Sequence, residues 1–248
     1  MLEEIKVIFE DDDLVVINKP AGILVHGDNK STEPTVVDWL EKRYPDAIGV
    51  GETQLDQSGT PLRRSGVVHR LDRDTSGVLV LAKNQASFEH LKNQFQDRLA
   101  QKEYRAFVYG AVRDKWGTID KPIGRNARDG RLRSAQHGAK GVLRDAVTHY
   151  ERIVEGQYEG ELFSYLKLTP KTGRTHQIRV HLKAIDRPIV QDELYSAGKY
   201  KDSNNLGLSR LALHAHILEL ETPAGAKERF IAPVPMEFEE AAERIAWE

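Results

Sequence analysis

The sequence predicts an α+β fold with a mixed, mostly antiparallel central sheet and flanking helices and loops. Strand patterns outnumber helical ones, and short turns join several of them. The regular alternation of strand and helix that a doubly wound parallel sheet needs is missing. With 248 residues, of which 40% are hydrophobic, the chain can bury one sizeable core or two small ones that share a sheet.

Two strands are predicted at the start of the chain. Ile5, Val7 and Phe9 lie at strand spacing on one face, and an acidic turn leads into the apolar run 14–17. Pro20 and Gly22 stop this second strand, because proline lacks the amide hydrogen that a strand ladder needs. Lys19 therefore stands at the end of a strand.

The spacing of apolar residues predicts the remaining elements. Asn84 is a suitable N-cap for the second of the expected helices. Apolar residues at helical spacing predict helices over about 35–44, 84–99 and 176–185, and a polar helix ends the chain. Apolar runs and alternation predict strands at 67–68, 78–81, 104–109, 146–153, 162–168, 211–217 and 229–231.

Residues 124–144 lose this periodicity and collect six basic side chains against the single acid Asp129. The whole chain is nearly balanced, with 36 Lys and Arg against 38 Asp and Glu, so its net charge of −2 gives no global attraction to a polyanion. Any nucleic-acid site must come from local clustering. The stretch 124–144 is the one clearly basic segment.

Several classes of protein are excluded or disfavoured by composition. The chain has no cysteine, which excludes disulfides, a thiolate zinc site and a cysteine nucleophile. His214 and His216 share a strand face but have no obvious third ligand, so no metal is expected. No phosphate-binding glycine motif supports a nucleotide cofactor. The acidic N-terminus is unlike a secretory signal, and no run approaches the roughly 20 apolar residues of a membrane span, so a cytoplasmic location is expected.

The densest group of chemically active residues is HRLDRDTSG at residues 69–77, between two predicted strands. Arg70 and Arg73 flank Asp72, and nearby positive charge favours an ionised carboxylate. Such a carboxylate can attack a sugar carbon or stabilise an oxocarbenium-like centre. The alternative is that Asp72 or Asp74 only caps a turn.

A second group, TGRTHQIRVH at residues 172–181, lies at a turn that enters a helix. Helical spacing places His176, Arg179 and Lys183 on one face, and the glycine turn offers backbone N–H groups to an anion. The alternative is an exposed basic helix face without a ligand. Tyr104 lies in an apolar strand, where the spacing favours core packing; its other possible role is to stack on a base and move a proton.

The segment HRLDRDTSGVLVLAK at residues 69–83 resembles the signature of the RluA-type pseudouridine synthases. Further segments match in the same order, and together they cover nearly the whole chain. They are NKPAG at 18–22, KEYRAFVYG at 102–110, TGRTHQIRVH at 172–181 and LHAH at 213–216.

The resemblance implies an enzyme that isomerises uridine to pseudouridine in RNA. It implies that Asp72 is the nucleophile, that Tyr104 packs against the target base and assists removal of the C5 proton, and that Arg179 pairs with Asp72. Arg70 is expected to hold the displaced phosphodiester or the flipped nucleotide. The target uridine must leave the base stack, and no cofactor or metal is implied.

The expected partner is structured RNA, with large-subunit ribosomal RNA favoured and transfer RNA as the alternative. The whole chain, 1–248, is expected to be a single catalytic domain without the small S4-like domain of many relatives, and to act as a monomer. RNA selection would then fall to the catalytic domain. The expected RNA contacts are Lys19, Arg63, Arg64, Arg70, Arg73, Arg125, Arg128, Arg131, Arg133, Lys140, Arg144, Arg174 and His176.

Two competing functions remain. A nucleoside or glycoside hydrolase could also use Asp72, but it would ordinarily need a second carboxylate, and no acid in the matched segments is an obvious partner. A non-catalytic RNA-binding module would bind RNA without changing it. The near-neutral charge argues against this second alternative, because pure binders usually carry a stronger basic bias.

Overall fold

The computed structural model describes residues 2–27, 32–56, 58–127, 129, 132–135, 139–196, 200 and 203–246. The chain forms two compact units, each built from two stretches of sequence. The first unit comprises residues 1–101 and 215–233, and the second comprises residues 102–214 and 234–248. Each unit is described by itself. The prediction of a single catalytic domain over the whole chain stays a prediction.

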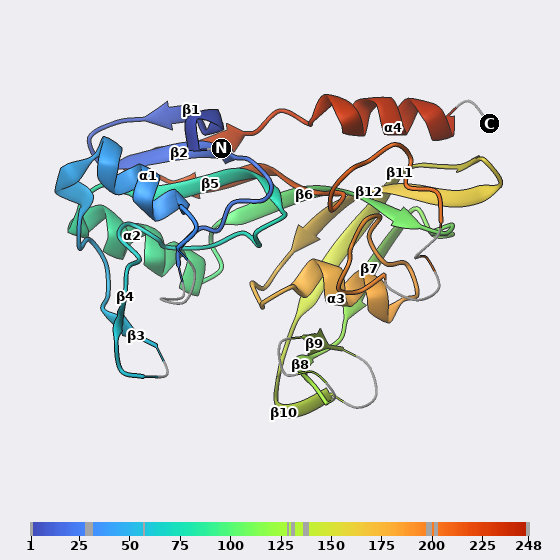
Figure 1. The fold of residues 1–248 in the computed structure, drawn as a ribbon, viewed down its shortest axis with the longest axis horizontal. Helices are drawn as coiled ribbons and strands as arrows, with labels where there is room; N and C mark the ends of the chain where they lie inside the picture. Colours follow the sequence, from blue (N-terminus) through green and yellow to red (C-terminus); the bar gives the residue numbers. More distant parts are fainter. Residues whose placement is uncertain are drawn as a thin grey trace. The chain divides into compact units, whose positions relative to one another are not determined.

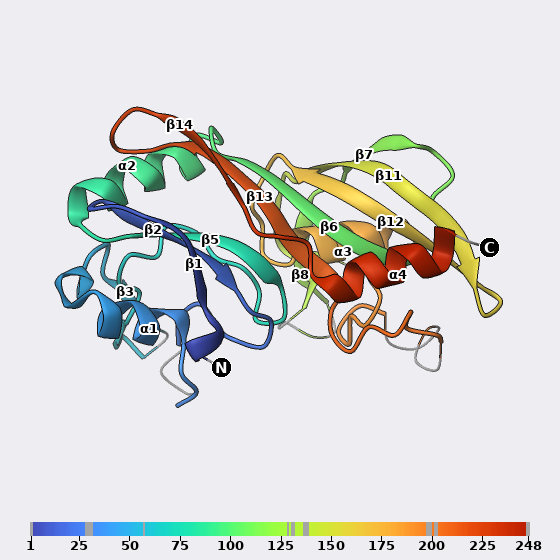
Figure 2. The same cartoon turned by 90° about the horizontal axis from the view of Figure 1, so that it is seen from above.

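The first unit is a twisted, mostly antiparallel sheet with two helices. Its strand order is β1-β2-β5-β13, and β14 folds back on β13, as Figure 2 shows. The strands β2 and β5 are buried along nearly their whole length, because their apolar runs face protein on both sides. The strands are β1 (Lys6–Glu10), β2 (Leu14–Lys19), β5 (Ser76–Ala82), β13 (Leu213–Glu221) and β14 (Lys227–Ile231).

The helices of the first unit begin at side-chain caps. Thr35 and Asp38 form a reciprocal capping box at the start of α1 (Val36–Arg43). Asn84 accepts the N–H of Ser87 at the start of α2 (Gln85–Gln96), which confirms the predicted cap. The helix ends before Leu99, which was expected on its apolar stripe but is 64% exposed. The short elements are η1 (Leu2–Glu4), η2 (Pro45–Ala47) and the hairpin of β3 (Gln54–Leu55) and β4 (Pro61–Leu62), which projects away from the sheet (Figure 1).

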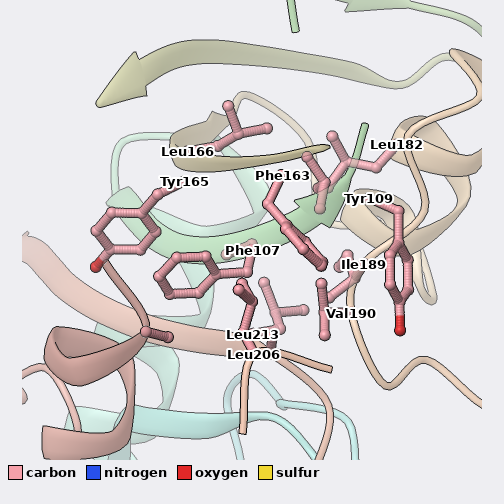
Figure 3. Close-up of a cluster of buried hydrophobic side chains, with 14 of the residues drawn as sticks. Phe107, Tyr109, Phe163, Tyr165, Leu166, Leu182, Ile189, Val190, Leu206 and Leu213 are labelled. Atoms are coloured by element: carbon pink, nitrogen blue, oxygen red, sulfur yellow. The ribbon is translucent and has the colours of Figure 1, made fainter. Parts of the chain in front are cut away.

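The second unit has its own antiparallel strands, in the order β6-β12-β11-β7, and a large aromatic core (Figure 3). Phe107 stacks on Tyr165 with 4.3 Å between ring centroids, and Phe163 and Val190 are fully buried beside them. The elements are β6 (Gln101–Tyr109), β7 (Trp116–Asp120), β11 (Val147–Tyr158), β12 (Glu161–Pro170), α3 (Gln177–Ala184) and α4 (Met236–Ala246).

The predicted polar C-terminal helix is α4, and it is amphipathic rather than polar throughout. Its Phe238, Ala241 and Ile245 are buried in the core of the second unit. The charged residues between them mask this apolar stripe in the sequence.

The basic stretch, expected to lack regular structure, contains three short strands. β8 (Ile123–Asn126), β9 (Arg133–Ser134) and β10 (Ala139–Arg144) form a separate antiparallel sheet in the order β10-β8-β9. We call residues 123–144 the arm; Figure 1 shows its strands beyond α3, away from the larger sheet of this unit. Because β10 is largely exposed, its side chains need no apolar alternation, and the usual strand pattern is absent from the sequence.

The α+β class with a mostly antiparallel sheet is confirmed. Among the described residues, no helix is long and apolar enough to cross a membrane.

Candidate active site

The loop that carries Asp72 is fixed at both ends. Before the loop, Val67 forms a β-bridge with Leu81 of β5, and after it the chain enters β5 at Ser76. The main-chain carbonyl of Asp72 accepts the N–H of Thr75 at 3.2 Å, so a backbone hydrogen bond closes this turn. Gly77 has a φ of +117°, and a Cβ there would lie 2.1 Å from the carbonyl oxygen of Ala215. Only glycine fits, which fixes the path of the loop. The Asp72 side chain itself is half-buried.

The position of Lys19 contradicts its predicted role as an RNA contact. The residue is fully buried, and its Nζ donates to the carbonyls of Pro20 at 2.8 Å, Ile23 at 2.8 Å and Arg73 at 2.9 Å. An ammonium group has three hydrogens, and all three are used. Lys19 therefore ties the end of β2, from inside the protein, to the loop that carries Asp72, one residue after Asp72.

Arg70 lies on the exposed side of the loop beside His26. Its Nη1 is 3.0 Å from Nε2 of His26, while Nδ1 of His26 lies 2.9 Å from the carbonyl of Gly27. A carbonyl only accepts, so Nδ1 donates and Nε2 accepts from Arg70. Burial, and secondarily the charge of Arg70, lowers the pKa of Arg64. Two guanidinium groups and an imidazole thus gather on this part of the first unit.

Two other residues of the loop make structural contacts. His69 stacks on Phe95 with 4.3 Å between ring centroids, and its Nε2 accepts the N–H of Val80 at 3.1 Å. Arg73, an expected RNA contact, forms an exposed ion pair with Glu33 at 3.1 Å and donates to the carbonyl of Gly22 at 3.2 Å. The shape of the loop thus depends on several side chains besides glycine.

The second group of residues, at the start of α3, is anchored by buried polar side chains. The carboxamide oxygen of Gln177 accepts from the hydroxyl of Thr172 at 2.7 Å, and its nitrogen donates to the hydroxyl of Thr148 at 3.0 Å. Thr148 is also 2.9 Å from Nδ1 of His181, whose Nε2 donates to the carbonyl of Lys121 at 3.0 Å. Burial lowers the pKa of His181, which favours the neutral ring that these bonds require.

Arg179 is buried, which argues against the alternative of an exposed basic helix face at this position. Its Nε and Nη2 each donate to the carboxylate of Asp192 at 2.8 Å, a bidentate pair that the sequence did not suggest. Its guanidinium lies 5.1 Å from the ring centroid of Tyr195. His176 is the N-cap residue in the left-handed conformation, with a φ of +55°, and lies outside the helix.

The predicted pair of Arg179 with Asp72 stays a prediction, because the two residues belong to different units. Asp192 and Tyr195 were missed because their segment has no helix or strand period. The only available signal was an acid that closely follows the buried Ile189 and Val190.

Tyr104 lies on β6 opposite Leu168 and packs, partly buried, against the core of the second unit. Lys102 lies on the same strand, two residues before Tyr104, and burial lowers the pKa of its ammonium group. A Cβ on Gly173 would lie 3.6 Å from Nζ of Lys102, so this ammonium group lies beside the turn that enters α3.

The expected RNA contacts of the second unit are spread over the arm and the start of α3. Arg125 is exposed on β8, Arg133 is half-buried on β9, and Nε of Arg174 donates to the carbonyl of Asp145 at 3.1 Å. The expected contacts Arg128 and Arg131 lie outside the described residues.

No group of three or more His, Asp or Glu side chains that could hold a metal ion is found in the part of the chain that the structure describes. His214 packs edge-on against Phe238. Nδ1 of His216 donates to the carbonyl of Ala232 at 2.8 Å.

Comparison with known families gives a match to the RNA pseudouridylate synthase family over residues 13–184, which is more than half of the chain. The chain belongs to this family. The predicted RluA-type pseudouridine synthase family is thereby confirmed, and with it the enzyme class.

Similar proteins span the chain almost completely. An uncharacterized RNA pseudouridine synthase of Synechocystis is 39% identical over 94% of this chain and 66% of its own length. Ribosomal large subunit pseudouridine synthase D of Borreliella burgdorferi is 36% identical over 94% of this chain and 66% of its own length. The solved structure of human RNA pseudouridylate synthase domain containing 1 matches with a TM-score of 0.73 at 27% identity, covering 95% of this chain and 85% of that chain. The chain thus spans about two thirds of the length of these curated relatives.

Proposed function

We propose that this member of the RNA pseudouridylate synthase family isomerises uridine to pseudouridine in structured RNA, with Asp72 as the nucleophile. The observation that carries the proposal is the rigid loop 69–77, which holds a half-buried carboxylate between fixed contacts of Lys19 and Gly77. A carboxylate on a fixed loop is suited to attack at a defined atom.

The reaction breaks the bond between N1 and C1′ of the uridine and forms a bond between C5 and C1′. A proton leaves C5 and one is gained at N1, so atoms balance and no oxidation state changes. We therefore assign no cofactor. The uridine leaves the base stack, because neither C1′ nor C5 can be reached within it.

In this proposal Tyr104 packs against the flipped base and assists removal of the C5 proton. Arg179 pairs with the Asp72 carboxylate and keeps it charged in a desolvated pocket, for which a planar guanidinium is suited.

Large-subunit ribosomal RNA is the substrate we favour. Relatives from Borreliella burgdorferi and Haemophilus influenzae that are 36% and 35% identical bear the name ribosomal large subunit pseudouridine synthase D. Transfer RNA is the second candidate. The proposed contacts are Arg70 beside the catalytic loop, Arg174 and His176 at the start of α3, and Arg125 and Arg133 on the arm. The proposal assumes a monomer that acts in the cytoplasm.

Tritium release from RNA labelled at uridine C5 tests the proposal. Ribosomal and transfer RNA from cells that lack the enzyme would be incubated with wild type, with Asp72→Asn and with Asp74→Asn, an exposed carboxylate of the same loop as a matched control. Release by wild type and Asp74→Asn but not by Asp72→Asn, with unchanged circular dichroism, is the expected result. Free uracil would indicate a hydrolase, and RNA binding without release would indicate a binding module.

A further inference from the structure

The carboxylate of Asp192 is a fully buried acceptor for four donors. Arg179 donates to it twice at 2.8 Å, and the N–H groups of Leu194 and Tyr195 donate to Oδ1 at 3.1 and 3.2 Å. The backbone just before Asp192 is fixed as well. The N–H of Val190 donates to the carbonyl of Phe107, and the carbonyl of Val190 accepts the N–H of Ala212. Asp192 is therefore held by the core and in turn fixes the plane of the guanidinium.

Only Nε and Nη2 of Arg179 are used by Asp192. Nη1 is thereby directed away from Asp192. A guanidinium held by two of its nitrogens presents the third in a single orientation, whereas one held by a single bond can rotate.

Tyr195 joins three parts of the second unit. Its ring lies under the Arg179 guanidinium, and its hydroxyl accepts the backbone N–H of Arg133 at 3.1 Å. The same hydroxyl lies 2.8 Å from Nδ1 of His176, to which it can donate its own hydrogen. One side chain thus contacts the arm, the N-cap of α3 and the arginine of α3.

The arm is also attached to this point by apolar packing. Tyr195 forms a small buried cluster with Ile123 of β8, with Val180 of α3 and with Ala146, which precedes β11. Leu132 packs against this cluster. This cluster is separate from the main core of the unit. The base of the arm and the helix that carries Arg179 therefore share one set of contacts.

We infer that Asp192 and Tyr195 are positioning residues: Asp192 orients Arg179, and the Tyr195 hydroxyl fastens the RNA-contacting arm to the start of α3. The inference rests on the proposed function. Asp192 should then affect the rate of the chemical step, and the Tyr195 hydroxyl should affect the binding of RNA. Kinetics can distinguish the two effects, because loss of Asp192 should lower kcat and loss of the Tyr195 hydroxyl should raise KM.

A double-mutant cycle tests the part of Asp192. Asp192→Asn keeps the shape but removes the charge, and it should lower kcat by about 100-fold, the loss expected when a reacting group is misplaced by about 1 Å. If Asp192 acts through Arg179, the double variant with Arg179→Lys loses no more activity than Arg179→Lys alone. Losses that multiply would overturn this assignment, since independent effects on folding add.

Tyr195→Phe tests the second part and keeps the ring under Arg179. Loss of a hydroxyl with two hydrogen bonds should raise both KM and the dissociation constant for RNA by about 3- to 10-fold, with kcat unchanged within about twofold. The matched control is Tyr150→Phe, which removes a hydroxyl for which the described residues give no hydrogen bond. Equal behaviour of the two variants, or a fall in kcat alone, would refute the assignment.

The tests of Asp192 and of Tyr195 are independent, so failure of one variant to fold does not prevent the other test. If Asp192→Asn does not fold, Asp192→Glu, which keeps the charge but moves the carboxylate, replaces it in the cycle with Arg179→Lys, and the comparison of Tyr195→Phe with Tyr150→Phe still decides the part of the inference that concerns Tyr195. Wild-type protein that binds RNA but releases no tritium would refute the proposed function instead. The RNA dissociation constants of the two tyrosine variants would still show whether the hydroxyl fastens the arm.

Discussion

Replacement of Lys19 by methionine removes the internal tie between β2 and the loop that carries Asp72, while the side chain keeps a similar length. The carbonyls of Pro20 and Ile23 lose their donor, whereas that of Arg73 keeps the N–H of Gly22 at 2.9 Å. Each buried carbonyl without a donor costs about 1–3 kcal/mol. The ammonium no longer has to be desolvated, which offsets part of this loss. We therefore expect the free energy of unfolding to fall by about 2–4 kcal/mol.

Urea unfolding followed by circular dichroism measures this change, and kcat for tritium release measures the effect on the loop. The matched control is Lys6→Met, the same substitution at an exposed position of β1, which should change the free energy of unfolding by less than about 0.5 kcal/mol. Equal unfolding midpoints for the two variants would refute the reasoning. So would a destabilised Lys19→Met enzyme with wild-type kcat, since the tie would then have no part in holding Asp72.

Three further predictions follow from other parts of the chain. Gly77→Ala should lower the free energy of unfolding by at least about 2 kcal/mol, because the Cβ meets Ala215 and the φ of +117° is strained; a melting temperature equal to that of wild type would contradict it. Because burial lowers the pKa of His181 below its usual 6.5, the unfolded chain takes up a proton first. Stability should therefore be full above pH 6.5 and be lost as the pH falls towards the folded-state pKa, and His181→Gln should show a smaller loss in melting curves over this range. Arg125→Ala should reduce the slope of log RNA affinity against log salt by about one, and an unchanged slope would remove Arg125 from the interface.

Much of the fold could be predicted because its signals are local. The apolar runs of β2 and β5, the Asn84 cap of α2 and the loop with Asp72 are each encoded by neighbouring residues. Local patterns depend on side-chain period and turn chemistry, which the sequence displays directly. The family could be recognised for a similar reason, since its motifs are short and contiguous.

The strands of the arm could not be predicted from local sequence patterns. The longest of them, β10, is largely exposed, and β8 and β9 are only four and two residues long, so no alternation of apolar and polar residues marks them in the sequence. The stripe of α4 was hidden for another reason: its three buried residues are separated by charged ones that the opposite face carries.

The sequence by itself determined the fold class, most of the elements, the family and the position of Asp72. Only the tertiary structure decided which charges are buried and which groups neutralise them. Lys19 looks like a surface cation at a strand end, yet its ammonium group donates to one carbonyl 54 residues away in the chain as well as to carbonyls close to it in the sequence. Arg179 finds its carboxylate 13 residues later, on a segment without regular structure. Such partners are set by packing in three dimensions, because a buried charge must find its acceptors wherever the folded chain brings them.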